Sequence, residues 1–554
     1  MAAESCGLMA ARSDDGHRNM VPRWRYTGRT PFNAEHVGAP RRGKINPQAG
    51  ADLSVAEALW RTEPSFVHAV ELISCACASG RPLLSRDSAA WLRAAKIRVP
   101  DALNSTIDWI LKGAPPNERA WATPDTSNES GLLEAQRTIR TGRARLREGP
   151  RNVAGWLDLS LAYCVLGQGK NALRAMTVAL GLAPNHRVIL RSAARLLVHL
   201  KETDAAHMLI RRHPRTPTDP WLMATEISVA QILERPSLFA ASGRRFAQEH
   251  AGQPAFVSEL AGAVASAENS AGEHRRAHKL YQLSLLEPTD NVVAQVQYLS
   301  QIDRSLSYGF NGLNLPSAVE ARTWRAMTDE RWDEALKEAT EWQADEPFSG
   351  RPATAVSFLA ILMGDPSAAA ISARTGLRAN GDDQLLRNNL SVAYARMGRH
   401  AEAQAEFNKI RGPLQRGFPK YVFDATKGLM AYIGGNLELG RELYQLALRG
   451  APMGDRAFVA LSFVETEWDF VPQARPSMRE ELKKILDKIA VPAARVVARR
   501  LVKSPLEAAH AGSGTTKLVS AQEYARTLLV CDEHRANQVV DAAPIFPAAR
   551  DKRR

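Results

Sequence analysis

Few residues of this chain have the types and spacing that catalysis requires. The nearest candidate is the Gly-Ser-Gly-Thr-Thr-Lys stretch at residues 512–517, which superficially resembles a phosphate-binding loop. In such a loop a Gly-Lys pair precedes a Ser or Thr, and the loop follows a strand. Here the lysine comes last and no strand is expected before it. We therefore interpret the stretch as a flexible linker.

The other candidate groups do not have the spacing of a metal site either. Cys75 and Cys77 form an isolated Cys-x-Cys, and on a helix two such thiols point about 200° apart. His68 and Glu71 lie one helical turn apart, which suits either a shared site or a solvated helix face. No familiar ligand spacing joins His510, Asp532, Glu533 and His534. The sequence therefore predicts no enzyme, no cofactor and no metal site.

A pattern of small and bulky residues that recurs about every 34 positions is the strongest feature of the sequence. Small residues suit the crossing point of two helices, and bulky residues fill the seam to the next pair. A period of this length indicates a series of helix pairs that each pack on the next. The residues that define it are Trp156, Ser160, Tyr163, Ala172, Pro184, Ala335, Pro347, Leu390, Ser391, Tyr394, Ala403, Phe407, Gly440, Tyr444, Ala447 and Pro452.

These residues resemble the tetratricopeptide repeat (TPR) family, whose repeats have Trp, Leu, Gly and Tyr in the first helix and Ala, Phe, Ala and Pro in the second. The resemblance is close at residues 153–186, 384–417 and 421–454, and it extends over roughly 153–455. It implies an all-α fold, a right-handed superhelical solenoid of helix-turn-helix repeats, with helical extensions at both ends.

The resemblance also implies a groove, lined by the first helix of each repeat, that binds a peptide or partner protein. The positions that contact partners in the family fall here on Arg191, Arg195, His199, Trp324, Met327, Arg351, Phe358, Ile361, Asn388, Arg396, Leu429 and Tyr432. Aromatic and arginine side chains often anchor interfaces. For Phe358, Ile361 and Leu429, packing between helices is an equally good interpretation. The family's clamp for a C-terminal carboxylate is absent, because leucines occupy its positions at Leu157 and Leu161.

Shifts in composition divide the chain into six parts. We expect a disordered basic tail at 1–50, a small helical module at 51–112, a linker at 113–131, the solenoid at 132–455, a helical extension or cap at 456–535, and a flexible basic tail at 536–554. The helical module can be a docking unit or an atypical N-terminal cap. The basic amphipathic helix that follows Pro492 can bind a membrane or an acidic partner, or cap the last repeat.

Charge, cysteine content and hydropathy restrict the class of protein. The net charge of +13 lies mostly at the two ends, so the repeats are nearly neutral and do not suit a continuous nucleic-acid track. The basic ends remain candidates for nucleic-acid contact. Five scattered cysteines do not make a disulfide framework. Without a secretory signal or an apolar run of about 18 residues, we expect a cytoplasmic protein with no membrane span.

The function that these observations favour is a non-catalytic scaffold or adaptor for protein–protein interaction, whose partner the sequence does not name. Two alternatives stay open. One is a nucleic-acid-associated regulator that uses the basic ends together with Arg191 and Arg195. The other is a sensor or accessory subunit of a bacterial multi-gene system.

Overall fold

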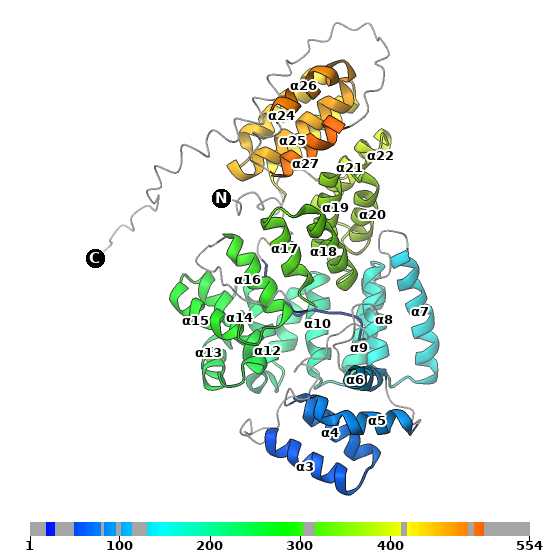
Figure 1. The fold of residues 1–554 in the computed structure, drawn as a ribbon, viewed down its shortest axis with the longest axis vertical. Helices are drawn as coiled ribbons and strands as arrows, with labels where there is room; N and C mark the ends of the chain where they lie inside the picture. Colours follow the sequence, from blue (N-terminus) through cyan, green and yellow to red (C-terminus); the bar gives the residue numbers. More distant parts are fainter. Residues whose placement is uncertain are drawn as a thin grey trace, which may run out of the picture.

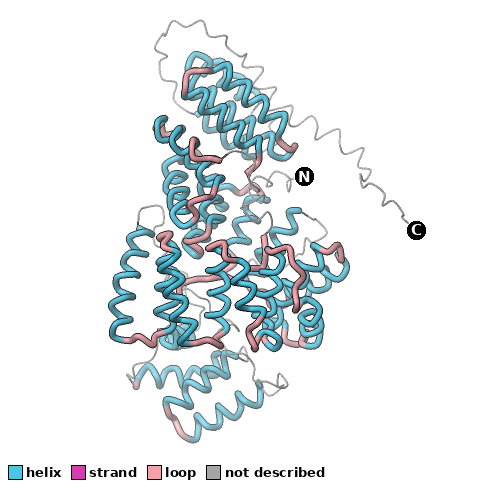
Figure 2. The backbone as a smooth tube through the Cα atoms, turned by 180° about the vertical axis from the view of Figure 1, so that it is seen from behind, coloured by secondary structure: helices cyan, strands magenta, loops and turns pink. Residues whose placement is uncertain are grey.

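Most of the residues that the structure describes lie in helices. A computed structural model describes residues 18–27, 49–78, 82–95, 101–112, 130–302, 315, 317–411, 418–485 and 492–503. These residues contain no strand (Figure 2), so the expected all-α class is confirmed for them. None of their helices is both long enough and apolar enough to cross a membrane.

Helices that follow one another in the sequence pack as neighbours, in a repeat-like series of pairs (Figure 1). A long helix, α7 (Ser130–Glu148), precedes the pairs and packs on the first of them. The first four pairs are α8 (Val153–Val165) with α9 (Gly169–Leu182), α10 (Arg187–His199) with α11 (Thr203–Arg211), α12 (Pro220–Ile232) with α13 (Ala240–Glu249), and α14 (Pro254–Ser270) with α15 (His274–Ser284).

A single helix, α16 (Asp290–Ile302), separates these pairs from the next four. They are α17 (Val319–Thr328) with α18 (Trp332–Asp345), α19 (Gly350–Met363) with α20 (Pro366–Ala379), α21 (Gln384–Arg396) with α22 (His400–Phe407), and α23 (Lys420–Ile433) with α24 (Leu437–Gly450). Polar side chains cap several of these helices; for example, Asp383 accepts a hydrogen bond from the Leu386 N–H at the start of α21.

The turn inside every pair has the same geometry. One residue of each turn has a left-handed backbone, and the N–H of the next residue donates to the carbonyl five residues earlier, as in a Schellman motif. The left-handed residues are Gly167, Lys201, Glu234, Gly272, Glu330, Gly364, Gly398 and Gly435. Three of them are not glycine, so this conformation recurs at the expected spacing even where the residue type does not favour it.

The same hydrogen bond joins the two helices within a pair at two places that are far apart in the sequence. Ser160 Oγ on α8 donates to the Ala172 carbonyl on α9 at 2.8 Å, and Ser391 Oγ on α21 donates to the Ala403 carbonyl on α22 at the same distance. Both alanines are fully buried. The small residues that define the sequence period therefore lie where the helices of a pair cross, as the pattern predicts.

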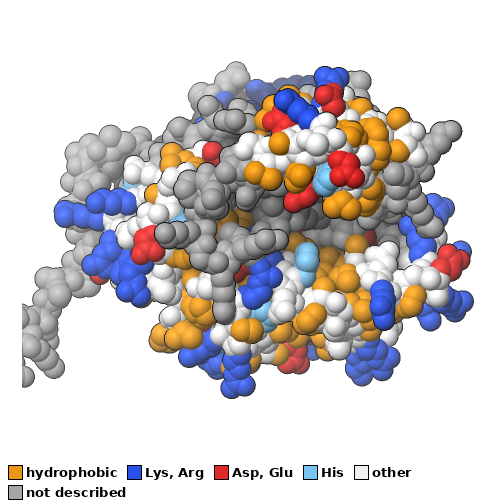
Figure 3. Space-filling view, turned by 90° about the horizontal axis from the view of Figure 1, so that it is seen from below, with side chains coloured by type: hydrophobic (Ala, Val, Ile, Leu, Met, Phe, Trp, Pro, Cys, Tyr) orange, Lys and Arg blue, Asp and Glu red, His pale blue; other side chains and the backbone are white. Residues whose placement is uncertain are grey.

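The helices that precede the pairs have small cores of their own. They are α3 (Ala49–Thr62), α4 (Phe66–Ala78), α5 (Arg86–Ala94) and α6 (Asp101–Lys112), with a short 3-10 turn, η2, at Pro82–Ser85. Ile73, Leu92 and Ile107 form one buried cluster between them. Figure 3 views the molecule from this end, where apolar side chains, in orange, lie among basic ones, in blue. Val67 and Leu83 are among the exposed apolar residues of this part.

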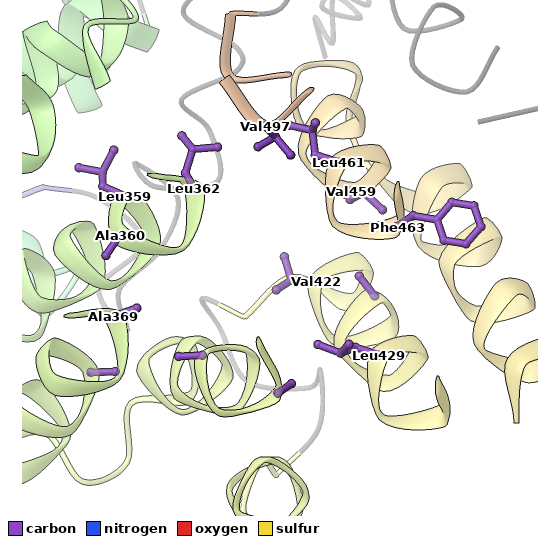
Figure 4. Close-up of a cluster of buried hydrophobic side chains, with 14 of the residues drawn as sticks. Leu359, Ala360, Leu362, Ala369, Val422, Leu429, Val459, Leu461, Phe463 and Val497 are labelled. Carbon is purple, nitrogen blue, oxygen red and sulfur yellow. The ribbon is translucent and has the colours of Figure 1, made fainter. Parts of the chain in front are cut away.

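The helices that follow the pairs share one apolar cluster with them. These helices are α25 (Met453–Phe470), α26 (Arg475–Ile485) and α27 (Pro492–Lys503), with a 3-10 turn, η6, at Pro472–Ala474. Figure 4 shows Leu359 and Leu362 of α19, Val422 and Leu429 of α23, Leu461 of α25 and Val497 of α27 around this cluster. The apolar side of α27 is thus buried, and its Arg500 donates to the Leu362 carbonyl at 3.1 Å near the end of α19.

Part of the expected disordered tail at 1–50 is instead placed against the helices. Residues 18–27, here called the N-terminal segment, cross the middle of the molecule with Arg18, Met20, Trp24 and Arg25 buried. The expectation of disorder was wrong for these residues, because their arginines and apolar side chains have partners far along the chain. Most of the expected linker, the stretch at 512–517 and the C-terminal tail lie outside the described residues.

The left-handed turns give a test of the repeat geometry. We expect Gly398→Ala to lower the stability of the chain by about 1 kcal/mol, because a left-handed backbone disfavours any side chain with a Cβ. A Cβ at Gly398 meets no atom within 4 Å, so no steric clash contributes. The measurement is the midpoint of thermal unfolding. Gly181→Ala, in open space on α9, is the matched control and is expected to leave the midpoint unchanged or raise it.

Candidate functional site

The N-terminal segment lies along the helix pairs as a ligand would. It contains neither helix nor strand between residues 18 and 26, and it passes from α16 and α17 to α8 (Figure 1). Its side chains bond to residues between 131 and 323 positions away in the sequence. Helices from several pairs therefore contribute to one continuous site.

Arg18 forms the first anchor of the segment. Its Nε donates to Glu320 Oε1 at 2.9 Å, and its two terminal nitrogens donate to Gln295 Oε1 and Asn291 Oδ1, each at 2.8 Å. Asn291 and Gln295 are one turn apart on α16, while Glu320 is in the first turn of α17. The guanidinium is therefore enclosed, and its side chain is only 1% exposed.

Arg23 and Arg25 bind a group of acidic side chains that includes Glu320. Arg23 donates to Glu346 at 2.7 Å and to Glu320, and its Nε lies 3.5 Å from Asp290. Arg25 donates to Asp290 at 2.5 Å and to Asp345 at 2.6 Å. We call Asp290, Glu320, Asp345 and Glu346 the acidic cluster. They come from the start of α16, the first turn of α17 and the end of α18.

Two apolar side chains alternate with the arginines and fill pockets between helices. Met20 is fully buried in a cluster with Leu260, Val292 and Val296. A Cβ on Gly262 would lie 3.1 Å from the Met20 methyl carbon, so the glycine makes room for it. Trp24 is 1% exposed and packs on Phe348 with 5.3 Å between ring centroids.

The segment ends at a polar contact with the first pair. The Thr27 backbone N–H donates to Asp158 Oδ1 and its hydroxyl donates to Asp158 Oδ2, each at 2.7 Å. Earlier in the segment, the Val21 carbonyl accepts a hydrogen bond from Asn291 at 3.1 Å. Both contacts involve the backbone of the segment, so they fix its path and not only its side chains.

The guanidinium groups determine the charge state of the buried acids. Burial raises the pKa of Glu320, but Arg18, Arg23 and Arg351 outweigh burial and hold that pKa well below its ordinary value. Burial opposed by Arg23 and Arg195 likewise leaves the pKa of Glu346 at about 2. At Asp158 burial prevails over the two Thr27 hydrogen bonds and raises the pKa to about 6. Glu320 and Glu346 are therefore ionised at neutral pH. At Asp345, burial and the nearby carboxylates of Glu346 and Asp290 outweigh Arg25 and raise the pKa above its ordinary value.

The acidic cluster depends on the segment for its neutralisation. Arg351 also pairs with Glu320, but Asp290 and Asp345 have their ion pairs, among the described residues, only with Arg23 and Arg25. Removing one partner of a buried ion pair typically costs about 3–5 kcal/mol, because a charge is left without compensation. The surface is thus built for a cationic occupant.

Five of the expected groove residues lie at or beside this site. Arg351 donates to Glu320, and Trp324 Nε1 lies 3.4 Å from the same carboxylate. Arg195 stacks over Phe348 at 4.9 Å, and His199 packs edge-on against that ring at 5.3 Å. Arg191 pairs with Glu259, which also accepts from Asn291. The surface expected from the family resemblance therefore coincides here with the surface that holds the segment.

The other expected groove residues contact the chain itself, mostly through α25. Phe358 packs on Phe458 with 5.6 Å between ring centroids, and Tyr432 donates to Glu467. Arg396 donates to Thr466 at 3.2 Å. Asn388 accepts from Thr426 on α23 at 2.7 Å, and Met327 and Leu429 lie in the large apolar cluster, with Ile361 packed against it. Along this part of the series, α25 occupies the position in which we expected a partner.

Sequence reasoning missed the acidic cluster and its occupant. The signal of the occupant was present in the spacing of Arg18, Arg23 and Arg25, with Met20 and Trp24 between them, inside a tail otherwise rich in proline and glycine. Large apolar side chains that alternate with arginines are not typical of a fully solvated tail. The acids gave no such signal, because they come from three separate helix ends, with only Asp345 and Glu346 adjacent, and the fold brings them together.

The chemistry that this arrangement supports is recognition. The site holds carboxylate and amide oxygens that accept hydrogen bonds from guanidinium groups, with aromatic rings beside them. Within the described ranges, no group of three or more His, Cys, Asp or Glu residues suits a metal ion. The chain matches no protein-family model, and no curated protein matches it.

Release of the segment can be followed by limited trypsin digestion. We expect Glu320→Gln to raise the rate of cleavage after Arg18, Arg23 and Arg25 by about tenfold or more, because it breaks a buried ion-pair network. The fragments are identified by mass spectrometry. Glu249→Gln, at an exposed position on α13, is the matched control and is expected to leave the rate unchanged. Equal protection in all three proteins would contradict the contribution assigned to Glu320.

The lowered pKa of Glu346 predicts a pH dependence. Its folded pKa of about 2 is below the ordinary value of 4.5, so its contribution to stability is complete above pH 4.5 and is lost as the pH falls toward 2. We therefore expect the thermal midpoints of the wild-type chain and Glu346→Gln to differ most at pH 6, and the difference to be clearly smaller at pH 3. Comparison at equal pH cancels the titration of Asp158 and His199. A constant difference would argue against the assigned charge state.

Proposed function

We propose that this chain is a non-catalytic, cytoplasmic scaffold or adaptor, a right-handed superhelical solenoid of TPR-like repeats that binds a segment of a partner protein. The observation that carries the proposal is the N-terminal segment itself. It lies across α16, α17 and α8 with its arginines and apolar side chains buried, as a bound peptide would. A surface that holds one extended segment through side-chain pockets has the properties needed to hold another.

The shape of the helix pairs supports the same proposal. Left-handed turns at Gly167, Gly398 and Gly435, and the Ser–Ala contacts between the two helices of a pair, are the features that the resemblance to TPR proteins implies. Stacked helix pairs offer long surfaces for binding and few enclosed pockets for chemistry.

The nucleic-acid alternative receives less support. Arg191 is 2% exposed, pairs with Glu259 and stacks on Trp221 at 4.9 Å, so it is not presented to a phosphate. Arg18, Arg23 and Arg25, which supply part of the positive charge of the N-terminal end, are directed at carboxylates. Phosphate binding requires exposed cations along a common face, and these arginines do not provide one.

Affinity capture from the native host tests the proposal. The bait is the full chain, either wild type or with Arg18, Arg23 and Arg25 all replaced by glutamine to vacate the acidic cluster, and all captures are treated with nuclease. We expect a protein partner that is enriched by the vacated bait and lost when Glu320→Gln and Glu346→Gln are added. Capture of nucleic acid alone, lost at high salt, would instead favour the alternative.

A further inference from the structure

We propose that the acidic cluster recognises a partner segment whose arginines are spaced as Arg-x-x-x-x-Arg-x-Arg, and that the chain's own N-terminal segment competes for the same surface. This inference rests on the proposed function and specifies its ligand. The observations that carry it are the placement of Arg18, Arg23 and Arg25 on separate acids and the two apolar pockets between them.

The geometry selects arginine over other cations. Arg18 donates from three nitrogens in different directions, to Glu320, Gln295 and Asn291. Arg23 and Arg25 each bond to more than one carboxylate. A planar guanidinium with five donors can satisfy such divergent acceptors at once, whereas a lysine ammonium is a compact point charge with three. Replacing arginine with lysine would leave buried acceptors without donors.

The apolar pockets define the spacing and direction of the ligand. The Met20 pocket beside Gly262 lies two residues after the first arginine, and the Trp24 pocket beside Phe348 lies between the second and third. A sequence read in the opposite direction would place an arginine against the apolar walls of the Met20 pocket. The partner segment is therefore expected to carry an unbranched apolar residue and an aromatic residue at these two positions.

The competition follows from shared contacts. Asp290 and Asp345 cannot pair with Arg25 of the N-terminal segment and with an arginine of a partner at the same time. A partner segment and the N-terminal segment therefore exclude one another. Since the N-terminal segment is covalently attached, it is present at a high effective concentration and weakens any partner that must displace it. A partner binds strongly only where its affinity, or its local concentration, exceeds that of the attached copy.

The test measures binding of a fluorescein-labelled peptide with the sequence of residues 16–28 by fluorescence anisotropy. The receptors are the full wild-type chain, the full chain with R18Q, R23Q and R25Q, and that variant with Glu320→Gln added. We expect binding to the vacated chain, little binding to the wild type, and a loss of about thirtyfold or more on adding Glu320→Gln. Addition of Glu249→Gln to the vacated chain is the matched control and is expected to change nothing.

A second receptor keeps all three arginines, so its result does not depend on whether the substituted chain folds. A protease site inserted between residues 30 and 45 of the wild-type chain permits cleavage, after which the released segment is expected to exchange with the labelled peptide. Peptides in which the three arginines are lysines, or in which Met20 is alanine, are expected to lose most of this binding. Failure of the labelled peptide to bind either receptor would overturn the inference, as would equal binding of the lysine peptide.

Two further outcomes distinguish this inference from the proposed function. Host capture that depends on Glu320, without binding of the arginine peptide, would leave the scaffold in place and overturn the ligand assigned here. A wild-type chain that is dimeric by light scattering, with its N-terminal segment cross-linked to the acidic cluster of the other copy, would overturn competition within one chain. It would assign the surface to a second copy instead.

Discussion

The burial of Glu320 among three guanidinium groups is the interaction on which the centre of this structure depends. Its side chain is 1% exposed and lies between Arg18, Arg23 and Arg351. One of these arginines comes from the repeat-like helices and two come from the N-terminal segment. A buried carboxylate is costly to desolvate unless it is paired and hydrogen-bonded. The packing of α16, α17 and α19 around this point is therefore coupled to whether a cationic segment is bound.

The chain covers the expected binding face in two physically different ways. Along the second half of the series, α25 packs through a continuous apolar cluster that also includes α19, α23 and α27. Along the middle, the N-terminal segment is held largely by ion pairs, with Met20 and Trp24 as its large buried apolar anchors. Apolar burial of that extent makes α25 a permanent part of the fold. Ion pairs can be exchanged for equivalent ones, so the N-terminal segment is the replaceable element.

The repeat-like helices were predictable from the sequence because their determinants are local. The small residues at Ser160, Ala172 and Ser391 and the turn glycines at Gly167 and Gly398 act within one helix pair, so their spacing is visible along the chain. The left-handed turns at Lys201, Glu234 and Glu330 show that the geometry persists where its usual residue is missing. The helix pairs around them were correspondingly harder to recognise.

The candidate site could be predicted only in part, because its determinants are not local. Arg351 and Trp324 were found through their place in the repeat, and both lie beside Glu320. The acids themselves are one residue at the start of each of α16 and α17 and an adjacent pair at the end of α18, and no spacing rule connects the three places. Their partner is a segment that composition alone describes as an unfolded tail. Only the three-dimensional arrangement shows that the arginines of this segment neutralise the acidic cluster.

The long sequence separation between the segment and its site has a consequence for biosynthesis. Arg18 and Glu320 are 302 residues apart, and Arg23 and Glu346 are 323 apart. At typical rates of about 5–20 residues per second, the ribosome needs on the order of 15–60 seconds to make the chain between them. During that interval the segment has left the ribosome while its docking surface does not yet exist. The arginines of a nascent chain are therefore accessible to other molecules. They become buried only when the middle of the fold is complete.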